Sequence, residues 1–138
     1  MVNQLDISEG HKLSPVVKAI TQDKIDHYAN VSGDLNPLHI DPDFASNTPF
    51  GGTIAHGMLV LASLSELMEK EFQAFWRNSG RLKIRFRGAA KPGDTISASG
   101  WVKQVVDGRV VCHLECHNQD KEILINGEAS VLFDGGKE

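Results

Sequence analysis

The strongest apolar pattern in the chain lies between Thr53 and Trp76. Apolar residues recur there at alternating spacings of four and three, which is the periodicity of a helix with one face on a core. Nearly every residue in the first half of this segment is apolar, so we expect that half to be buried. A helix of about twenty residues would be about 30 Å long, the width of a small domain. The predicted core stripe consists of Ile54, Met58, Leu61, Ser65, Met68 and Phe72.

The chain after residue 80 alternates apolar and polar residues, which is typical of strands with one buried face. Strands are expected at about 82–87, 96–102, 111–116 and 123–133. The segment 91–94 reads as a turn, and Asp107-Gly108 is a strong signal for a β-hairpin. In the last strand, the predicted inward face consists of Ile123, Ile125, Ala129, Val131 and Phe133.

The first third of the chain predicts shorter elements. Residues 13–20 form a β-prone run, and Thr21 offers an N-cap for a helix that ends before Ser32-Gly33. Asp41-Pro42 reads as an N-cap followed by a proline at the first helical position, which predicts a second, short helix. The expected fold class is α+β, with an antiparallel sheet wrapped around one long central helix, in a single domain over residues 1–138.

Composition places the chain among ordinary globular proteins, with 138 residues of which 41% are hydrophobic and 23% charged. The formal net charge of −4 argues against a general affinity for nucleic acid or anionic membranes. The N-terminal residues lack the pattern of a leader peptide, so we expect a cytoplasmic protein. Cys112 and Cys116 would lie about 13 Å apart on one strand, too far for a disulfide, and are expected to be buried thiols.

The segment SGDLNPLHIDPD, residues 32–43, holds the densest candidate chemistry. Pro37 fixes its own φ and drives Asn36 toward extended geometry, so the side chains of Asp34 and His39 can be held rigidly. The alternative is a turn-capping aspartate and a core histidine. A calcium loop is excluded, because the sixth position from Asp34 is His39 instead of glycine and the twelfth is Ala45 instead of glutamate. We expect no metal.

Two blocks, SGDLNPLHID and FGGTIAHGM, lie about twenty residues apart and are followed by RFRGAAKPGDTI. Together they closely resemble the MaoC-like family of hot-dog proteins, in particular its (R)-specific enoyl-CoA hydratases. The resemblance implies that Asp34 and His39 are catalytic and that the Gly57 amide binds the thioester carbonyl. It also implies that Ser65 supports the catalytic aspartate. A homodimer with sheets joined edge to edge is implied as well.

Individual residues support these roles with differing strength. Gly57 inside a helix costs about 1 kcal/mol relative to alanine unless its backbone must be approached closely, and the alternative is close packing against a strand. Ser65 is a lone hydroxyl on an apolar stripe, and could instead bond back to the carbonyl of Leu61. Asn36 is expected to orient the loop or the substrate.

A row of cations, Lys83, Arg85 and Arg87 with Lys91 beyond, could contact the phosphates of coenzyme A or of acyl carrier protein. The alternative is that these side chains form the solvated face of a strand. Arg85, Arg87 and Lys91 are therefore candidate phosphate-binding residues.

The predicted function is hydration of a trans-2-enoyl-CoA to the (R)-3-hydroxyacyl-CoA in fatty acid metabolism, a reversible lyase reaction without a cofactor. Thioester hydrolysis, dehydration on acyl carrier protein and non-catalytic acyl-thioester binding are the alternatives. Acyl chain length, the choice between the two carriers, the direction of the reaction and the division of roles between Asp34 and His39 cannot be deduced from the sequence.

Overall fold

The computed structural model describes residues 7–133, so the two ends of the predicted 1–138 domain lie outside the described residues. Five strands form one antiparallel sheet in the order β1-β3-β4-β5-β2. In chain order the elements are β1 (Val16–Ala19), α1 (Gln22–Ser32), α2 (Pro37–Ile40), α3 (Pro42–Ser46), α4 (Gly57–Phe72), α5 (Ala74–Ser79), β2 (Arg81–Phe86), β3 (Thr95–Val106), β4 (Arg109–His117) and β5 (Ile123–Leu132).

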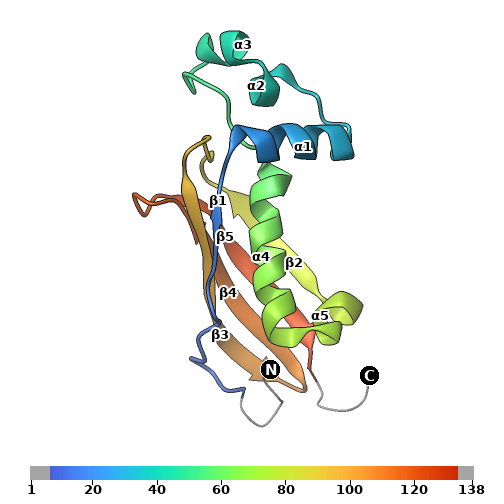
Figure 1. Ribbon diagram of the computed structural model, residues 1–138. Helices are drawn as coiled ribbons and strands as arrows, with labels where there is room; N and C mark the ends of the chain where they lie inside the picture. Colours follow the sequence, from blue (N-terminus) through green and yellow to red (C-terminus); the bar gives the residue numbers. More distant parts are fainter. Residues whose placement is uncertain (1–6, 134–138) are drawn as a thin grey trace.

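Helix α4 lies against one face of the sheet, and the core forms between them (Figure 1). Leu64, Leu67 and Met68 of α4 are completely buried. The sheet contributes alternate residues to the same core, as the burial of Cys112, Leu114 and Cys116 on β4 shows. This arrangement confirms the predicted hot-dog fold.

The ends of the central helix differ from the prediction of 53–76. Helix α4 begins at Gly57, because residues 53–56 lie outside any regular element and the backbone of His56 is extended, and it ends at Phe72. Gln73 has a φ of 49°, which ends α4 and turns the chain into the separate helix α5.

The predicted core stripe was also wrong in part. Met58 is 58% exposed, and Leu61 and Ser65 are only half-buried. The predicted stripe was counted from Ile54, which precedes the helix. Its positions therefore do not coincide with the face of α4 that is buried. The residues of α4 that face the core are Val60, Ser63, Leu64, Leu67, Met68, Glu71 and Phe72.

The sheet follows the predicted alternation, apart from the exposed Phe86 at the end of β2 and a local reversal on β5. Asp107 and Gly108 both have positive φ, as a two-residue hairpin turn between β3 and β4 requires. On β5, Leu124 is buried and Ile123 only half-buried, the reverse of the prediction. The pairing of β4 with β5 shifts between Cys116 and His117, and this irregularity changes which residue faces the core.

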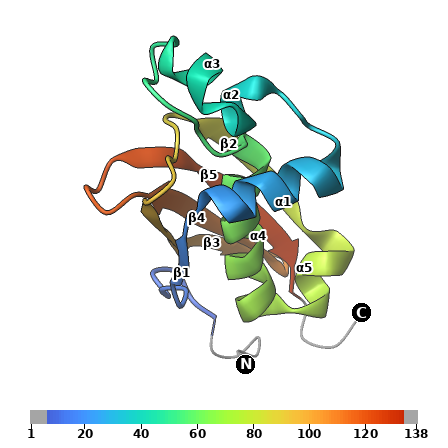
Figure 2. The same cartoon turned by 45° about the horizontal axis from the view of Figure 1, so that its top comes forward.

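The segment that carries the candidate chemistry extends beyond the N-terminal end of α4 (Figures 1 and 2). Helix α1 crosses that end, and α2 and α3 lie on the far side of α1. The predicted caps are confirmed: Thr21 accepts a hydrogen bond from the amide of Lys24, and Asp41 caps α3. Helix α2 was not predicted, although Asn36-Pro37 carries the same cap-and-proline signal as Asp41-Pro42.

Both cysteines are buried free thiols, as predicted. Burial, reinforced by the negative charge of Glu71, raises the pKa of Cys112 to about 12. Burial also raises the pKa of Cys116, against the opposing effect of its hydrogen bond with Ser63. Since the thiolate is the reactive form, both thiols stay unreactive at ordinary pH.

We therefore expect a thiol-specific reagent at about pH 8 to leave the native protein unmodified and to label both cysteines after unfolding in denaturant. Mass spectrometry of the labelled protein counts the modified sites. Rapid labelling of either cysteine in the native protein would contradict the buried position of β4 in this fold.

Candidate active site

An extended stretch, residues 53–56, connects the helices at the top of the molecule to α4. Its backbone is tied on two sides: the amide of Ile54 donates to the carbonyl of Leu38 at 3.3 Å, and the amide of Ala55 donates to the carbonyl of Ala90 at 2.8 Å. The side chains of Ile54, Ala55 and His56 are buried. These hydrogen bonds and this burial hold residues 53–56 in one position relative to α2 and to the segment before β3.

His39 on α2 is held by a hydrogen bond from its Nδ1 to the carbonyl of Ile54 at 2.8 Å. A carbonyl can only accept, so Nδ1 carries the hydrogen and Nε2 of the neutral ring is left as an acceptor. Gln22 of α1 donates to the carbonyl of His39 at 2.8 Å and accepts from the hydroxyl of Thr53. These contacts fix both the backbone and the ring of His39.

Asp34 lies in the loop between α1 and α2, with an exposed side chain. Its carboxylate accepts from the amide of Asn36 at 3.3 Å, and its own amide donates to the hydroxyl of Ser32. A carboxylate oxygen of Asp34 lies within 4.8 Å of a ring nitrogen of His39. Two hydrogen bonds of about 2.8 Å through one water molecule span such a gap.

His56 is the residue that sequence reasoning missed. Its side chain is only 2% exposed, and its Nε2 lies 3.0 Å from the backbone carbonyl of Asp34. Its ring stacks on His39, with centroids 3.9 Å apart and 27° between the planes, and Tyr28 packs against it. The available signal was a histidine within an otherwise apolar run.

Asp34, His39 and His56 offer ligand atoms within 4.8 Å of one another, close enough to raise the question of a metal. The nitrogen lone pairs of an imidazole lie in the plane of its ring. Because the two rings are stacked at only 27°, their lone pairs run side by side and do not converge on one point. This geometry fits a bound water better than a tetrahedral metal site.

Gly57 is the first residue of α4 and is exposed. Its amide is one of those at a helix start that have no partner within the helix. Gly57 directly follows His56, whose side chain contacts both Asp34 and His39. A side chain at this position would bring a Cβ to 2.9 Å from Cε1 of Phe86, so close packing also favours glycine here.

The side chains of Ser65 and Asn36 make hydrogen bonds with residues other than Asp34 and His39. The Ser65 hydroxyl accepts a hydrogen bond from Nε1 of Trp76 at 3.1 Å, and eight residues of helix separate it from Gly57 by about 12 Å. Within the described residues its hydroxyl makes no hydrogen bond with Asp34 or with the carbonyl of Leu61. Asn36 caps α2 by accepting from the amide of Leu38, which orients the loop.

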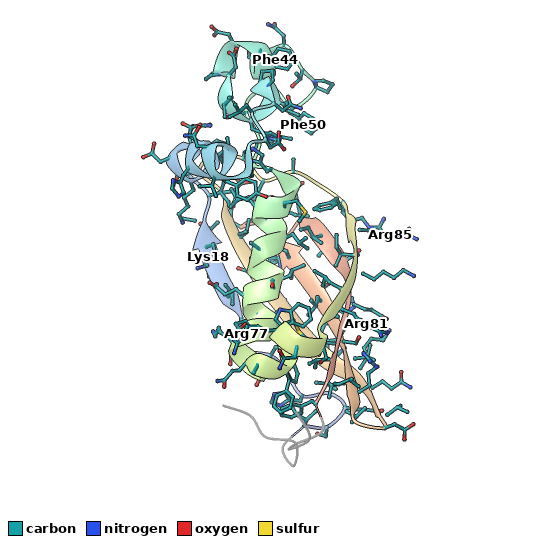
Figure 3. All side chains as sticks on the ribbon, turned by 90° about the vertical axis from the view of Figure 1, so that its right-hand side faces the viewer. Lys18, Phe44, Phe50, Arg77, Arg81 and Arg85 are labelled. Atoms are coloured by element: carbon teal, nitrogen blue, oxygen red, sulfur yellow. The ribbon has the colours of Figure 1, made fainter. Side chains whose placement is uncertain are left out.

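The candidate phosphate-binding residues are only partly brought together. Arg85 and Arg87 line one groove on the outer face of the sheet, with Lys83 and Asn126. Arg85 points outward from β2 (Figure 3). Lys91 lies on the turn that leads to β3 and does not line this groove.

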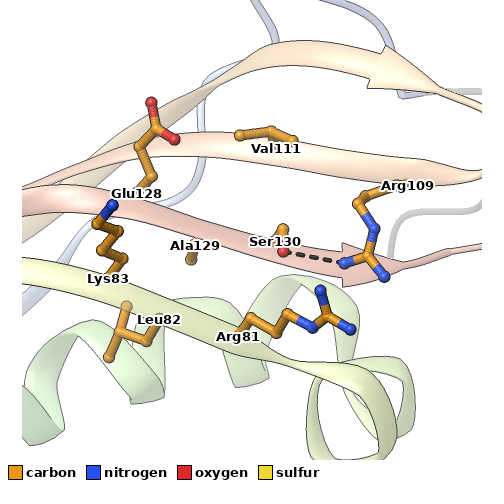
Figure 4. A pocket seen from close by; sticks show the side chains of 8 residues that line it. All are labelled: Arg81, Leu82, Lys83, Arg109, Val111, Glu128, Ala129 and Ser130. Atoms are coloured by element: carbon orange, nitrogen blue, oxygen red, sulfur yellow. Dashed lines mark hydrogen bonds between the residues drawn. The ribbon is translucent and has the colours of Figure 1, made fainter.

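A second hollow at the other end of β2 was not predicted. Arg81 and Arg109 approach Ser130 there, and Arg109 donates to the Ser130 hydroxyl at 3.0 Å (Figure 4). Lys83 and Glu128 lie farther along the same hollow. The outer face of β2 therefore carries positive charge along its length.

No helix within residues 7–133 combines the length and the apolar character that a membrane span requires. The MaoC like domain model matches residues 7–122. An (R)-specific enoyl-CoA hydratase of Rhodospirillum rubrum is 31% identical over 129 residues, which cover 92% of this chain and 88% of the relative. Fatty acid synthase subunit beta of Saccharomyces cerevisiae is 33% identical over 84% of this chain, but the match spans 6% of that protein.

Solved structures of hydratases are also similar to this chain. An R-hydratase of Pseudomonas aeruginosa superposes with a TM-score of 0.82 at 28% identity, over 94% of this chain and 83% of that one. The (R)-hydratase of A. caviae involved in PHA biosynthesis gives a TM-score of 0.81 at 27% identity, over 91% and 96%. With the family model covering most of its length, the chain belongs to the MaoC-like family.

Proposed function

We propose that this protein is a hydratase that adds water to a trans-2-enoyl-CoA and forms the (R)-3-hydroxyacyl-CoA, with dehydration as the reverse reaction. One observation carries the proposal: a carboxylate oxygen of Asp34 and a ring nitrogen of His39 lie within 4.8 Å of each other, in the segment that extends beyond the N-terminal end of an apolar helix. The relatives named as hydratases and 3-hydroxyacyl-thioester dehydratases support it.

The two acceptors define the reaction geometry. A water between the Asp34 carboxylate and Nε2 of His39 donates both hydrogens to them, which leaves an oxygen lone pair free for C3 of the substrate. As the C3–O bond forms, one acceptor takes a proton and the electron pair of the double bond moves toward the thioester oxygen. The protonated acceptor then delivers its proton to C2, so one water is added overall. Such acid–base steps contribute about 10² to 10⁴ in rate.

The negative charge on the thioester oxygen needs a donor, and the Gly57 amide supplies it. An exposed amide at the first position of α4 has no partner within the helix and lies at the positive end of the helix dipole. One such donor is worth about 10² to 10³ in rate. Side chains and one amide thus account for the chemistry, and the enzyme is proposed to need no metal or cofactor.

Two alternatives use the same fold. Thioester hydrolysis would direct the water at C1 and release a thiol, and dehydration on acyl carrier protein would use the cationic groove of Arg85 and Arg87 for a protein-bound phosphopantetheine. The two acceptors and the hydratase relatives favour water addition to the double bond. Cytoplasmic location stays a prediction.

The proposed activity predicts that the purified protein removes the enoyl absorbance of a short or medium trans-2-enoyl-CoA without releasing thiol. Chiral chromatography of the product should give the (R)-3-hydroxyacyl-CoA. A purely (S) product, or thiol release without formation of a 3-hydroxyacyl product, would contradict the assignment.

The shared water predicts non-additive losses for Asp34→Asn and His39→Gln. Each single variant should lose at least about 10²-fold in kcat, and the double variant should lose little more, because removing either acceptor already disables the unit. Melting curves should stay close to wild type, since both changes conserve shape. Normal turnover in both single variants would show that Asp34 and His39 are structural.

The sheet edge at β2 supports a homodimer. Strand β2 pairs with β5 on one side only, so its other edge offers free backbone groups. Phe86 on β2 is 53% exposed and Met58 at the start of α4 is similarly open. Pairing of two β2 strands would cover the free backbone edge and the exposed Phe86 and Met58 side chains. The neighbouring copy would then close each active site.

Sedimentation or light scattering at micromolar protein should therefore give twice the mass of one chain. Phe86→Lys, which places a charge at this edge, should weaken the dimer, whereas Val31→Lys on exposed α1 is the matched control and should not. A fully active monomer of the wild-type protein would contradict the proposal.

A further inference from the structure

His56 is a buried side chain for which the proposed reaction steps have no direct use. His56 is the N-cap residue of α4. Only its backbone takes part in the cap, because its carbonyl accepts from the amides of Leu59 and Val60. Its imidazole makes no capping bond. Burying a histidine that any apolar residue could replace costs free energy, so its ring contacts require an explanation.

The first contact fixes the tautomer of His56. Its Nε2 lies 3.0 Å from the backbone carbonyl of Asp34, which can only accept. Nε2 therefore carries the hydrogen, and Nδ1 of the neutral ring is a lone pair. That Nδ1 is buried and has no hydrogen-bond partner among the described residues.

The second contact is the stack on His39. The rings lie 3.9 Å apart and nearly parallel, while Nδ1 of His39 bonds to the carbonyl of Ile54. The hydrogen bond to the Ile54 carbonyl thus prevents the His39 ring from rotating within its own plane. The stack on His56 prevents the ring from tilting or shifting out of that plane. One side chain contacts both the loop of Asp34 and the ring of His39.

We propose that His56 is a positioning residue: its Nε2–H holds the Asp34 carbonyl and its ring packs against the His39 ring, and it so sets the separation of the Asp34 carboxylate from His39. This inference rests on the proposed hydratase activity. It adds a requirement to that activity: the distance between the Asp34 carboxylate and His39 must be fixed. Neither residue can fix this distance alone, because each could keep its own hydrogen bonds while the other moved.

The ring of His56 is held from three elements. Tyr28 of α1 and His39 of α2 pack against it, and the loop between these helices meets it through the Asp34 carbonyl. Its Nδ1 is buried without a hydrogen-bond partner among the described residues, so the orientation of the ring depends on the Nε2 hydrogen bond and on these ring contacts.

Two variants separate the hydrogen bond from the stack. His56→Phe keeps an aromatic ring against His39 but loses the donor, and His56→Gln keeps a donor but loses the ring. We expect His56→Phe to lose about 10- to 100-fold in kcat, the effect of displacing a reacting group by about 1 Å, with KM for the enoyl-CoA nearly unchanged. His56→Gln should recover part of that loss.

His11→Phe is the matched control, because His11 also has a buried ring nitrogen without a hydrogen-bond partner among the described residues. It lies against Glu71, near the opposite end of α4 from the site. Its kcat and KM should equal those of wild type. Wild-type kcat in His56→Phe would overturn the proposal, as would an equal loss of kcat in His11→Phe.

Nitrogen NMR of the imidazoles in the unsubstituted protein tests the same inference without any variant. His56 should show the Nε2–H tautomer, with its hydrogen on the nitrogen that faces the Asp34 carbonyl. An Nδ1–H tautomer would overturn the proposal, even if the variants fail to fold. Since this measurement needs no substrate, inactivity of the wild-type enzyme would count against the hydratase function alone.

Discussion

The hydrogen bond between Nδ1 of His39 and the carbonyl of Ile54 is the interaction on which the site depends. It selects the tautomer that leaves Nε2 as an acceptor, and it joins α2 to the extended stretch before α4. That stretch is in turn tied to Leu38 and Ala90 by backbone hydrogen bonds. The position of Nε2 of His39 is therefore determined by backbone that cannot move without disturbing the core.

The fold gives this short stretch its rigidity. Helix α4 is buried against the sheet along most of its length, so its first residue, Gly57, occupies a fixed place at the end of the core. The segment that carries Asp34 and His39 is short and partly exposed, and it is held by local caps at Asn36 and Asp41. Stability thus comes from the sheet and helix, while the candidate active site lies at their edge.

Much of this could be predicted from local signals, because caps, turns and alternation act within a few residues. The cap at Thr21 and the hairpin at Asp107-Gly108 formed as expected. The helix start predicted at Thr53 was misplaced, since an apolar stretch before a helix looks like the first turn of a buried helix. The partners of Ser65 and His56 come from other elements, and no local pattern carries that information.

A crystal structure of the Asp34→Asn variant with a trans-2-enoyl-CoA bound is the most direct test of the account. The account predicts the thioester oxygen within about 3.2 Å of the Gly57 amide nitrogen, with C3 facing a water held by the residue 34 side chain and Nε2 of His39. An acyl chain bound instead in the groove between β1 and α4, lined by Ile20, Leu59 and Ser63, would contradict it.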